Sequence, residues 1–373
     1  MHKSAIVIGA GIVGLAMARS LAERGYNVVV FERNEKAIGA SVRNFGMLWP
    51  IGQPNGKMYE RALLSKSIWK QVCEEAGLWY EEKGSLHLAY NDLEREVIHQ
   101  FADANKNIRP VRVISAKEAV GKSEGVNPKN LHCALFSNDE MIIESRVAME
   151  KIPSYLSGKY KVTFHFNTAI TSIDYPSVTS GKRKWSAEEI YICSGEDFET
   201  LYPEVFADNQ FTKCKLQMMR LVTQPDNWRI GPSLCGGLSM IHYKSFEVAA
   251  SLPTLKAHYD ETMADYIKWG IHVMVSQNAE GECTIGDSHE YGLAHDPFNR
   301  QLINQLIIDY LKQFVQFKSW DLLQSWNGIY SKTTNGKTDC VYSPEQGVTI
   351  VNGLGGAGMT LAFGLAEELL SAQ

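Results

Sequence analysis

Three glycines near the N-terminus have a spacing that suits the binding of a phosphate group. Gly9, Gly11 and Gly14 follow the apolar run 4–8 and precede a stretch of helical composition, 15–22. Where a strand turns directly into a helix, glycines let the backbone approach a pyrophosphate, and the positive helix end attracts its charge. The spacing alone is weak, because a plain glycine turn without any ligand has the same pattern.

Glu32 is a second feature that points to the same ligand. It ends the β-branched run 27–31 and stands 18 residues after Gly14. A carboxylate at this place accepts hydrogen bonds from the hydroxyls of a ribose and repels a 2′-phosphate. Together with the glycines, Glu32 predicts an adenine dinucleotide site in a β-α-β unit. The alternative is a glycine turn with a surface glutamate.

Two other segments favour FAD over NAD as the dinucleotide. Segment 39–47 is rich in turn residues, and segment 351–360 has the pattern of a strand, a glycine turn and a helix. Such a turn can present backbone N–H groups and a helix start to the electron-rich end of a reduced flavin ring. A nicotinamide enzyme does not need this feature. The alternative for the second segment is a tightly packed terminal helix.

Composition excludes several classes of protein. The 373 residues exceed the size at which single cores stop growing, so two domains, or one large domain with inserted segments, are expected. The mixture of 45% hydrophobic and 21% charged residues is that of a globular protein. A net charge of −5 without basic runs argues against nucleic acid or a membrane surface as a partner. The seven cysteines show no C-x-x-C spacing, which favours a cytoplasmic protein without disulfides or a zinc site. The apolar stretch 5–18 resembles a signal peptide, but its glycines have the better explanation above.

The elements that must position these residues alternate along the chain. The hydrophobic runs 4–8 and 27–31 predict a parallel sheet covered on both faces. Further strands are expected at 84–90, 133–136, 164–173 and 189–193, and helices at 57–80, 91–106, 140–157, 257–269 and 297–315. Between 213 and 290 the pattern is mostly β, including strands at 213–222, 237–243, 246–252, 271–277 and 283–287.

With these motifs, the chain resembles the D-amino-acid oxidase and glycine oxidase family of FAD-dependent oxidoreductases over almost its whole length. The resemblance rests on GAGIVG at 9–14, Glu32-Arg33, ICSG at 192–195, Ile285-Gly286-Asp287, Trp326-x-Gly328 and the tail glycines. Within the family, the runs 41–54, 215–220, 286–289 and 355–368 resemble a bacterial subfamily associated with the breakdown of aminophosphonates, especially 2-aminoethylphosphonate and its N-alkyl relatives.

The resemblance implies an α/β fold: a Rossmann-like FAD-binding domain interleaved with a substrate domain built on a mixed β-sheet. The FAD domain is expected at 1–83, 140–212 and 320–373, and the substrate domain at 84–139 and 213–319. In the family chemistry, a neutral amine loses hydride from its α-carbon to flavin N5, and the resulting imine hydrolyses to an aldehyde or oxo acid. No side-chain base is strictly required, because the protein mainly orients the reacting bond.

The resemblance also implies which residues contact FAD. The expected contacts are Gly9, Gly11, Ile12, Val13, Gly14, Glu32, Arg33, Ser41, Arg43, Asn44, Gly46, Met47, Ser194, Gly195, Gly328, Gly353, Leu354, Gly355, Gly356, Gly358, Met359 and Thr360. Sarcosine oxidases attach flavin to a cysteine at the position of Gly328, so FAD is expected to be non-covalent here.

Departures from the family pattern concern the substrate anchor. Glycine oxidases hold the substrate carboxylate with an arginine where Tyr330 stands, and sarcosine oxidases use a lysine where Thr360 stands. A simple amino-acid substrate is therefore in doubt. Another cation must balance an anionic substrate, since a buried unpaired anion is costly. Arg43, beside Asn44, is the first candidate, and the alternative is that Arg43 contacts FAD.

Further substrate contacts are expected from the β-rich half that roofs the flavin, at His242, Tyr243, His272 and His289, and from Tyr330. No two histidines have the i, i+4 spacing of metal ligands, so no metal site is predicted. Lys215 and Arg220 fall on opposite faces of one strand, so at most one of them faces a ligand.

The preferred function is oxidation of a small primary or secondary amine, with 2-aminoethylphosphonate or its N-methyl derivative as the candidate substrate. The alternatives are a glycine, D-amino-acid or sarcosine type of oxidase, a NAD-dependent dehydrogenase, and a binding protein with structural FAD. Oxygen is favoured over another electron acceptor, and the sequence leaves the oligomeric state open.

Overall fold

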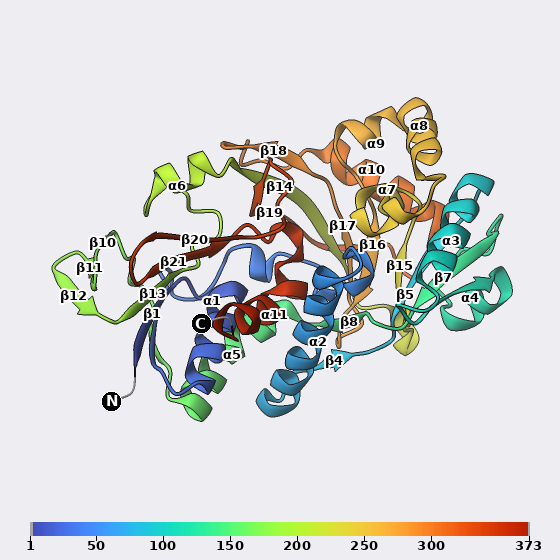
Figure 1. Ribbon diagram of the computed structural model, residues 1–373. Helices are drawn as coiled ribbons and strands as arrows, with labels where there is room; N and C mark the ends of the chain where they lie inside the picture. The colour runs from blue at the N-terminus through green and yellow to red at the C-terminus, as the bar shows by residue number, and fades with distance from the viewer. Residues whose placement is uncertain (1–2, 372–373) are drawn as a thin grey trace.

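The hydrophobic runs at the N-terminus form the centre of a six-stranded sheet in the computed structural model, which describes residues 3–371 (Figure 1). The strand order is β20-β21-β13-β1-β2-β9, and all neighbours from β21 to β9 are parallel. The strands are β1 (Ser4–Ile8), β2 (Asn27–Phe31), β9 (Thr163–His165), β13 (Glu189–Ile192), β20 (Cys340–Glu345) and β21 (Val348–Asn352).

Side chains of β1 alternate between the two faces of this sheet, and both faces are buried. Ala5 and Val7 pack with four helices, α1 (Ile12–Glu23), α2 (Lys57–Ala76), α5 (Ser145–Tyr160) and α11 (Gly358–Ser371). Ile6 and Ile8 face the other core, which lies under the small sheet β10 (Ser172–Asp174), β11 (Ser177–Ser180), β12 (Arg183–Ser186) and under α6 (Pro203–Asp208). The predicted α/β arrangement with a covered parallel sheet is therefore confirmed.

A second, nine-stranded sheet occupies the other half of the molecule (Figure 1). Its order is β18-β14-β17-β16-β15-β5-β7-β6, with β19 paired to β14. Its strands are β5 (Ser85–Ala89), β6 (Val111–Ser115), β7 (Cys133–Ser137), β14 (Phe211–Leu221), β15 (Ser233–Cys235), β16 (Met274–Gln277), β17 (Cys283–Gly286), β18 (Glu290–Gly292) and β19 (Leu322–Thr333). β5 and β15 pair in parallel, so the sheet is mixed.

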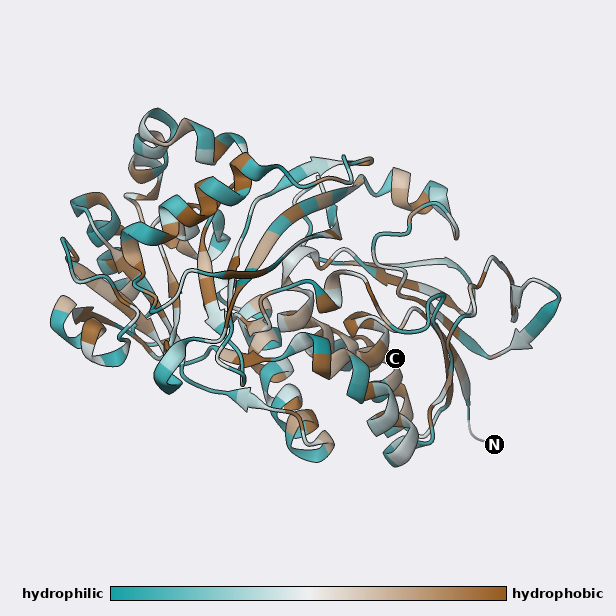
Figure 2. Ribbon diagram, turned by 180° about the vertical axis from the view of Figure 1, so that it is seen from behind, coloured by the Kyte–Doolittle hydropathy of each residue, from teal (hydrophilic) through white to brown (hydrophobic). Residues whose placement is uncertain are grey.

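Helices α3 (Asp92–Asn105), α4 (Ala116–Lys122), α8 (Leu252–Thr262), α9 (Ala264–Lys268) and α10 (Gln301–Phe314) lie around this second sheet. Figure 2 shows hydrophobic residues along the strands, while the outer helices alternate between hydrophobic and hydrophilic positions. A third sheet consists of three short strands in the order β3 (Met47–Leu48), β8 (Met141–Ile143) and β4 (Tyr80–Glu81).

Several sequence-based element assignments were wrong. The segments 237–243 and 246–252, predicted as strands, form the helix α7 (Leu238–His242), the 3-10 helix η4 (Lys244–Val248) and the start of α8. The predicted helix 140–157 begins only after β8, and the predicted strand 164–173 is a strand only near its two ends, in β9 and β10. Short apolar runs fit a buried helix as well as a strand, and tertiary packing decides between them.

The domain boundaries stay a prediction. β19, in the third segment predicted for the FAD domain, pairs along its length with β14 of the second sheet. Residues 1–2 and 372–373, at the ends of the predicted FAD domain, lie outside the described residues. Among residues 3–371, no helix combines the length and the apolar character needed to cross a bilayer.

Candidate functional site

A cavity of about 480 Å³ opens at the carboxyl ends of the parallel strands β1, β2 and β13. It is lined by the turn before α1 and by Glu32, which directly follows β2. In open parallel sheets, ligands bind outside these strand ends, where loops and helix N-termini converge. The cavity therefore has the position of a dinucleotide site.

The glycines beside this cavity permit close backbone packing. Gly9 has φ +105°, and a Cβ atom there would overlap the carbonyl oxygen of Cys193. A Cβ atom on Gly14 would overlap the carbonyl oxygen of Gly9. The turn into α1 consequently needs glycine at both positions, whether or not a ligand contacts them.

Polar groups around the turn hold it in place. The backbone N–H of Ile12, the first residue of α1, donates to Oγ of Ser41 over 2.9 Å. Glu32 is buried and accepts from the backbone N–H groups of Ala10 and Asn34, both over 3.0 Å. The Glu32 carboxylate thus lies in the cavity wall at a fixed position, as a ribose partner requires.

A second cavity of about 300 Å³ adjoins the first. Both cavities are lined by Ser41, Arg43 and Tyr330 and by residues of the tail loop 353–358, including Leu354 and Gly355. The second cavity extends from the tail loop toward α7 and β17 of the other half of the molecule. Together the two form one elongated site that reaches from the first sheet to the second.

Most of the predicted contact residues line this elongated site. The first cavity is lined by Gly9, Gly11, Ile12, Val13, Glu32, Arg33, Ser41, Arg43, Ser194, Gly195, Tyr330, Leu354, Gly355 and Gly358. The second is lined by Ile12, Ser41, Arg43, Asn44, Met47, His242, Tyr243, His272, His289, Gly328, Tyr330, Gly353, Leu354, Gly355, Gly356, Gly358, Met359 and Thr360.

Gly14 and Gly46 line neither cavity, because each lies against backbone. Gly46 has φ +71°, and a Cβ atom there would overlap the carbonyl oxygen of Ile143. Asn44 lines the second cavity, but its amide donates to the carbonyls of Ala40 and Ser41 and accepts from the N–H of Gly46. Asn44 therefore fastens the loop 40–46.

Arg43 is the predicted cation that reaches both cavities. Its side chain is half-buried, and one guanidinium nitrogen donates to the carbonyl of Asn327 over 3.2 Å. An arginine has four other N–H groups, so this contact leaves donors for a ligand.

Lys215 and Arg220 face neither cavity. Nζ of Lys215 donates to the carbonyls of Asp296 and Phe298, over 2.6 and 2.7 Å. Arg220 is buried and pairs with Glu144 and Glu282, each over 3.2 Å. Lys215 is held by backbone carbonyls and Arg220 by two carboxylates, and neither lines a cavity, so neither is an anchor for a ligand.

Sequence reasoning missed four charged residues of the second cavity, Lys244, Asp287, Lys332 and Lys337. Lys332 is half-buried there, its Nζ lies 3.2 Å from the hydroxyl of Tyr291, and burial lowers the pKa of its ammonium group. It stands two and four residues after Tyr330 and Gly328 on β19, so strand alternation places all three on one face. That spacing was a usable signal. Asp287, directly after β17, also lines the cavity.

Lys244 and Lys337 are exposed and line the same cavity. With Arg43 and Lys332 they make four cations against the one carboxylate, Asp287, among the described residues of its wall. A cavity with this excess of positive charge favours an anionic ligand.

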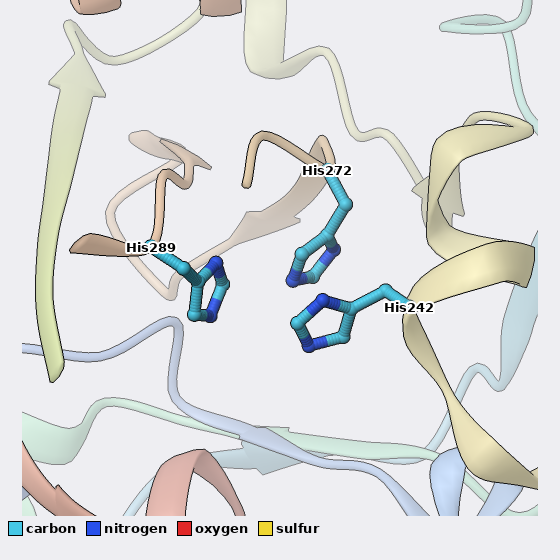
Figure 3. A group of neighbouring side chains, drawn as sticks. All are labelled: His242, His272 and His289. Carbon is cyan, nitrogen blue, oxygen red and sulfur yellow. The ribbon is translucent and has the colours of Figure 1, made fainter. Parts of the chain in front are cut away.

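Three histidines that were predicted separately come together at one end of this cavity (Figure 3). One ring nitrogen of each lies within 4.8 Å of one nitrogen of each other ring. His242 is exposed, whereas His272 and His289 are buried. Burial is the main cause that lowers the pKa of His272 well below the ordinary value and that of His289 to about 4. These two rings are therefore neutral at pH 7.

A family model described as FAD dependent oxidoreductase matches residues 4–372 of the chain. Among curated proteins, the chain is 26% identical to a glycine oxidase of Bacillus licheniformis over 242 residues, which are 61% of this chain and 62% of that protein. It is 36% identical over 106 residues, 27% of this chain, to the tRNA 5-methylaminomethyl-2-thiouridine biosynthesis bifunctional protein MnmC of Pseudomonas fluorescens. That match spans only 16% of the longer protein.

Among solved structures, the fold is similar to that of the glycine oxidase from Geobacillus kaustophilus, with a TM-score of 0.77. The likeness covers 100% of this chain and 94% of that one at 17% identity, so it is a likeness of fold. The predicted interleaved α/β fold class is confirmed by this match over the whole chain.

Proposed function

The chain belongs to the family of FAD-dependent oxidoreductases, and from this premise we propose that it oxidises a small primary or secondary amine that also carries an anionic group. The candidate substrates are 2-aminoethylphosphonate and its N-methyl derivative. The observation that carries the proposal is the second cavity, whose wall has four cations and one carboxylate and which adjoins the dinucleotide cavity.

The residues present fit FAD. The close turn at Gly9, the start of α1 and the carboxylate of Glu32 would hold its adenine nucleotide half. The tail loop 353–358, which lines the second cavity, would lie against its ring. When bound, FAD accepts a hydride from a carbon atom of the substrate. No covalent attachment is proposed, since glycine stands at 328.

Arg43 and Lys332 are the proposed anchors of the anionic group. Both are half-buried, so an anion between them is partly desolvated and attracted more strongly than it would be at the surface. When they hold the anionic group, the α-carbon of the substrate can lie over the flavin ring. This orientation is the main contribution of the protein to the rate. Tyr330 lies against Gly355 and Gly356 and lines both cavities.

The alternative substrate class is a simple amino acid such as glycine or sarcosine, since a glycine oxidase is among the relatives. The arginine that the family resemblance expects as a carboxylate anchor is replaced by Tyr330. Arg43 and Lys332 would then have to hold a carboxylate. The family match does not support the alternative of a NAD-dependent dehydrogenase. The cytoplasmic location, and oxygen as the electron acceptor, stay predictions.

Comparison of matched amines tests the proposal. The purified protein with its FAD is given 2-aminoethylphosphonate, glycine, sarcosine, D-alanine and propylamine, and the carbonyl product is trapped and identified. We expect kcat/KM for the phosphonate to exceed that for propylamine by at least about tenfold, because a charged contact contributes about 1.5–3 kcal/mol. Higher kcat/KM for glycine or D-alanine would instead identify an amino-acid oxidase.

A further inference from the structure

The three histidine rings at the end of the second cavity come from segments far apart in the sequence. His242 ends α7, His272 precedes β16 and His289 follows β17 (Figure 3). The ring centroids of His242 and His272 are 3.8 Å apart, and those of His272 and His289 are 5.2 Å apart. All three rings line the cavity, so their free atoms are available to a ligand.

A hydrogen bond on the far side of one ring fixes where its proton lies. Nδ1 of His289 is 2.9 Å from the carbonyl oxygen of Gly270, which can only accept, so this nitrogen carries the proton. Since the His289 ring is neutral, its Nε2 is left as a hydrogen-bond acceptor. Nδ1 of His272 lies 3.4 Å from Oγ of Ser239, and either atom can be the donor.

Asp287 is a second acceptor in the wall of this cavity. Its Oδ1 lies 3.2 Å from Nε2 of His272, and it receives no hydrogen bond from the described residues. The side chain is 5% exposed and lines the cavity. A buried acceptor without a donor is costly, so Oδ1 of Asp287 needs a ligand that brings hydrogen-bond donors or positive charge.

Two classes of ligand meet this requirement: a metal ion and a protonated amine. A metal ion lies in the ring plane of every imidazole that binds it. His242 and His272 stack at 3.8 Å with an angle of 29° between their planes, so their lone pairs do not converge on one point. An ammonium group has several donors that diverge from one nitrogen, and it suits acceptors that approach from different directions.

We propose that Asp287 binds the amino group of the substrate and takes up its proton before oxidation. This inference rests on the proposed function, because it assigns the place of the amine in the same cavity. In the step, one N–H bond of the ammonium group breaks, its electron pair stays on nitrogen, and the proton moves to Oδ1 of Asp287. The product is the neutral amine, which is the form that can lose a hydride from its α-carbon.

The surroundings of Asp287 favour this role. The titratable groups that face it are His272, Tyr243, Cys214, Tyr291 and Tyr330. All are uncharged at neutral pH, so none competes with the ammonium group as a counter-ion. Burial raises the pKa of the Asp287 carboxyl well above its ordinary value, which makes the carboxylate a better proton acceptor.

The test is the pH dependence of anaerobic flavin reduction in the FAD-loaded protein. Wild type, Asp287→Asn and the surface control Asp260→Asn are mixed with N-methyl-2-aminoethylphosphonate, sarcosine or glycine between about pH 6 and 10. If Asp287 keeps the proton of the amine inside the complex, the second-order rate constant of flavin reduction does not change with pH between the pKa of Asp287 and that of the amine. The amide in the Asp287→Asn variant cannot take the proton, so that rate constant should follow the neutral amine in solution and fall about tenfold per pH unit below the amine pKa.

We expect Asp287→Asn to be at least about thirtyfold slower than wild type at pH 8 and to approach it near pH 10. Asp260→Asn should match wild type throughout. A loss in Asp287→Asn that is equal at every pH, or a profile unchanged from wild type, would overturn the proposal, as would a stoichiometric metal ion that His272→Gln releases. Where Asp287→Asn does not retain FAD, the wild-type profile makes the test, since a wild-type rate constant that falls about tenfold per pH unit below the amine pKa would overturn the proposal. If no amine bleaches the wild-type flavin at any pH, the proposed function itself fails, and the inference with it.

Discussion

A guanidinium nitrogen of Arg43 donates to the carbonyl oxygen of Asn327 over 3.2 Å. This contact joins the loop after the 3-10 helix η1 (Ala40–Val42) to the long strand β19, which otherwise belongs to the second sheet. It holds Arg43 at the boundary between the two cavities. Arg43 can therefore contact a ligand in either cavity. Its substitution can distinguish a role in binding FAD from a role in binding the substrate.

Replacement Arg43→Ala should weaken the binding of anionic amines much more than that of neutral ones. Loss of one charged contact costs about 1.5–3 kcal/mol, so KM for 2-aminoethylphosphonate should rise about 10- to 100-fold. KM for propylamine should change less than about threefold. Steady-state kinetics of both amines, with Arg300→Ala as an exposed control, checks this. Equal increases for both amines, together with lower FAD content, would mean that Arg43 serves the cofactor.

Replacement Lys332→Gln should have the same selectivity without loss of FAD, because Lys332 lines only the second cavity. Burial lowers the pKa of its ammonium group, so Lys332 loses its charge at a lower pH than an exposed lysine does. The binding of an anion that depends on this charge should weaken at that lower pH. KM for the phosphonate measured against pH in wild type and Lys332→Gln checks this. An identical dependence in the two proteins would exclude Lys332 as the anchor.

Replacement Gly14→Ala should abolish FAD binding or folding, because the added Cβ atom would overlap the carbonyl oxygen of Gly9. The matched control is Gly158→Ala, whose added Cβ atom meets nothing within 4 Å. The control should be neutral or more stable, by up to about 1 kcal/mol, since alanine favours the helix. Flavin absorbance per protein and thermal unfolding report both effects. Full FAD content in Gly14→Ala would contradict the packing described for this turn.

Glu140 predicts a pH dependence of stability. It is 1% exposed and accepts from the N–H of Ile51 and the hydroxyl of Ser85, and burial raises its pKa from 4.5 to about 7. A raised pKa means that the folded state binds the proton more tightly. The contribution to stability is complete below pH 4.5 and is lost as the pH rises to about 7. The loss amounts to roughly 3 kcal/mol.

Replacement Glu140→Gln removes this titration. The free energy of unfolding of Glu140→Gln should therefore rise relative to wild type between pH 4.5 and 7, and the difference should be constant above. Urea unfolding at several pH values checks this, with the exposed Glu261→Gln as control. A difference that does not vary with pH would mean that Glu140 has an ordinary pKa in the folded protein.

Local patterns predicted the glycine turn and the carboxylate beside the first cavity, since Gly9, Gly14 and Glu32 lie within one β-α-β unit and their spacing follows from its geometry. The part of the second cavity that is lined by the histidines and Asp287 could not be predicted in the same way. His242, His272 and Asp287 meet because α7, β16 and β17 are brought together by the strand order of the second sheet, which no sequence spacing shows. The sequence pattern predicts a strand at 237–243, where α7 lies, because a short apolar run fits a strand as well as a buried helix.

The most direct test of the account is an anaerobic spectrum of the purified protein with its FAD, titrated with N-methyl-2-aminoethylphosphonate and then opened to air. We expect that the visible absorption of oxidised flavin disappears as the amine is added, while an equal concentration of glycine leaves it unchanged. Its return in air would identify oxygen as the acceptor. Flavin that is bleached by glycine or D-alanine and not by the phosphonate would contradict the anionic-amine assignment.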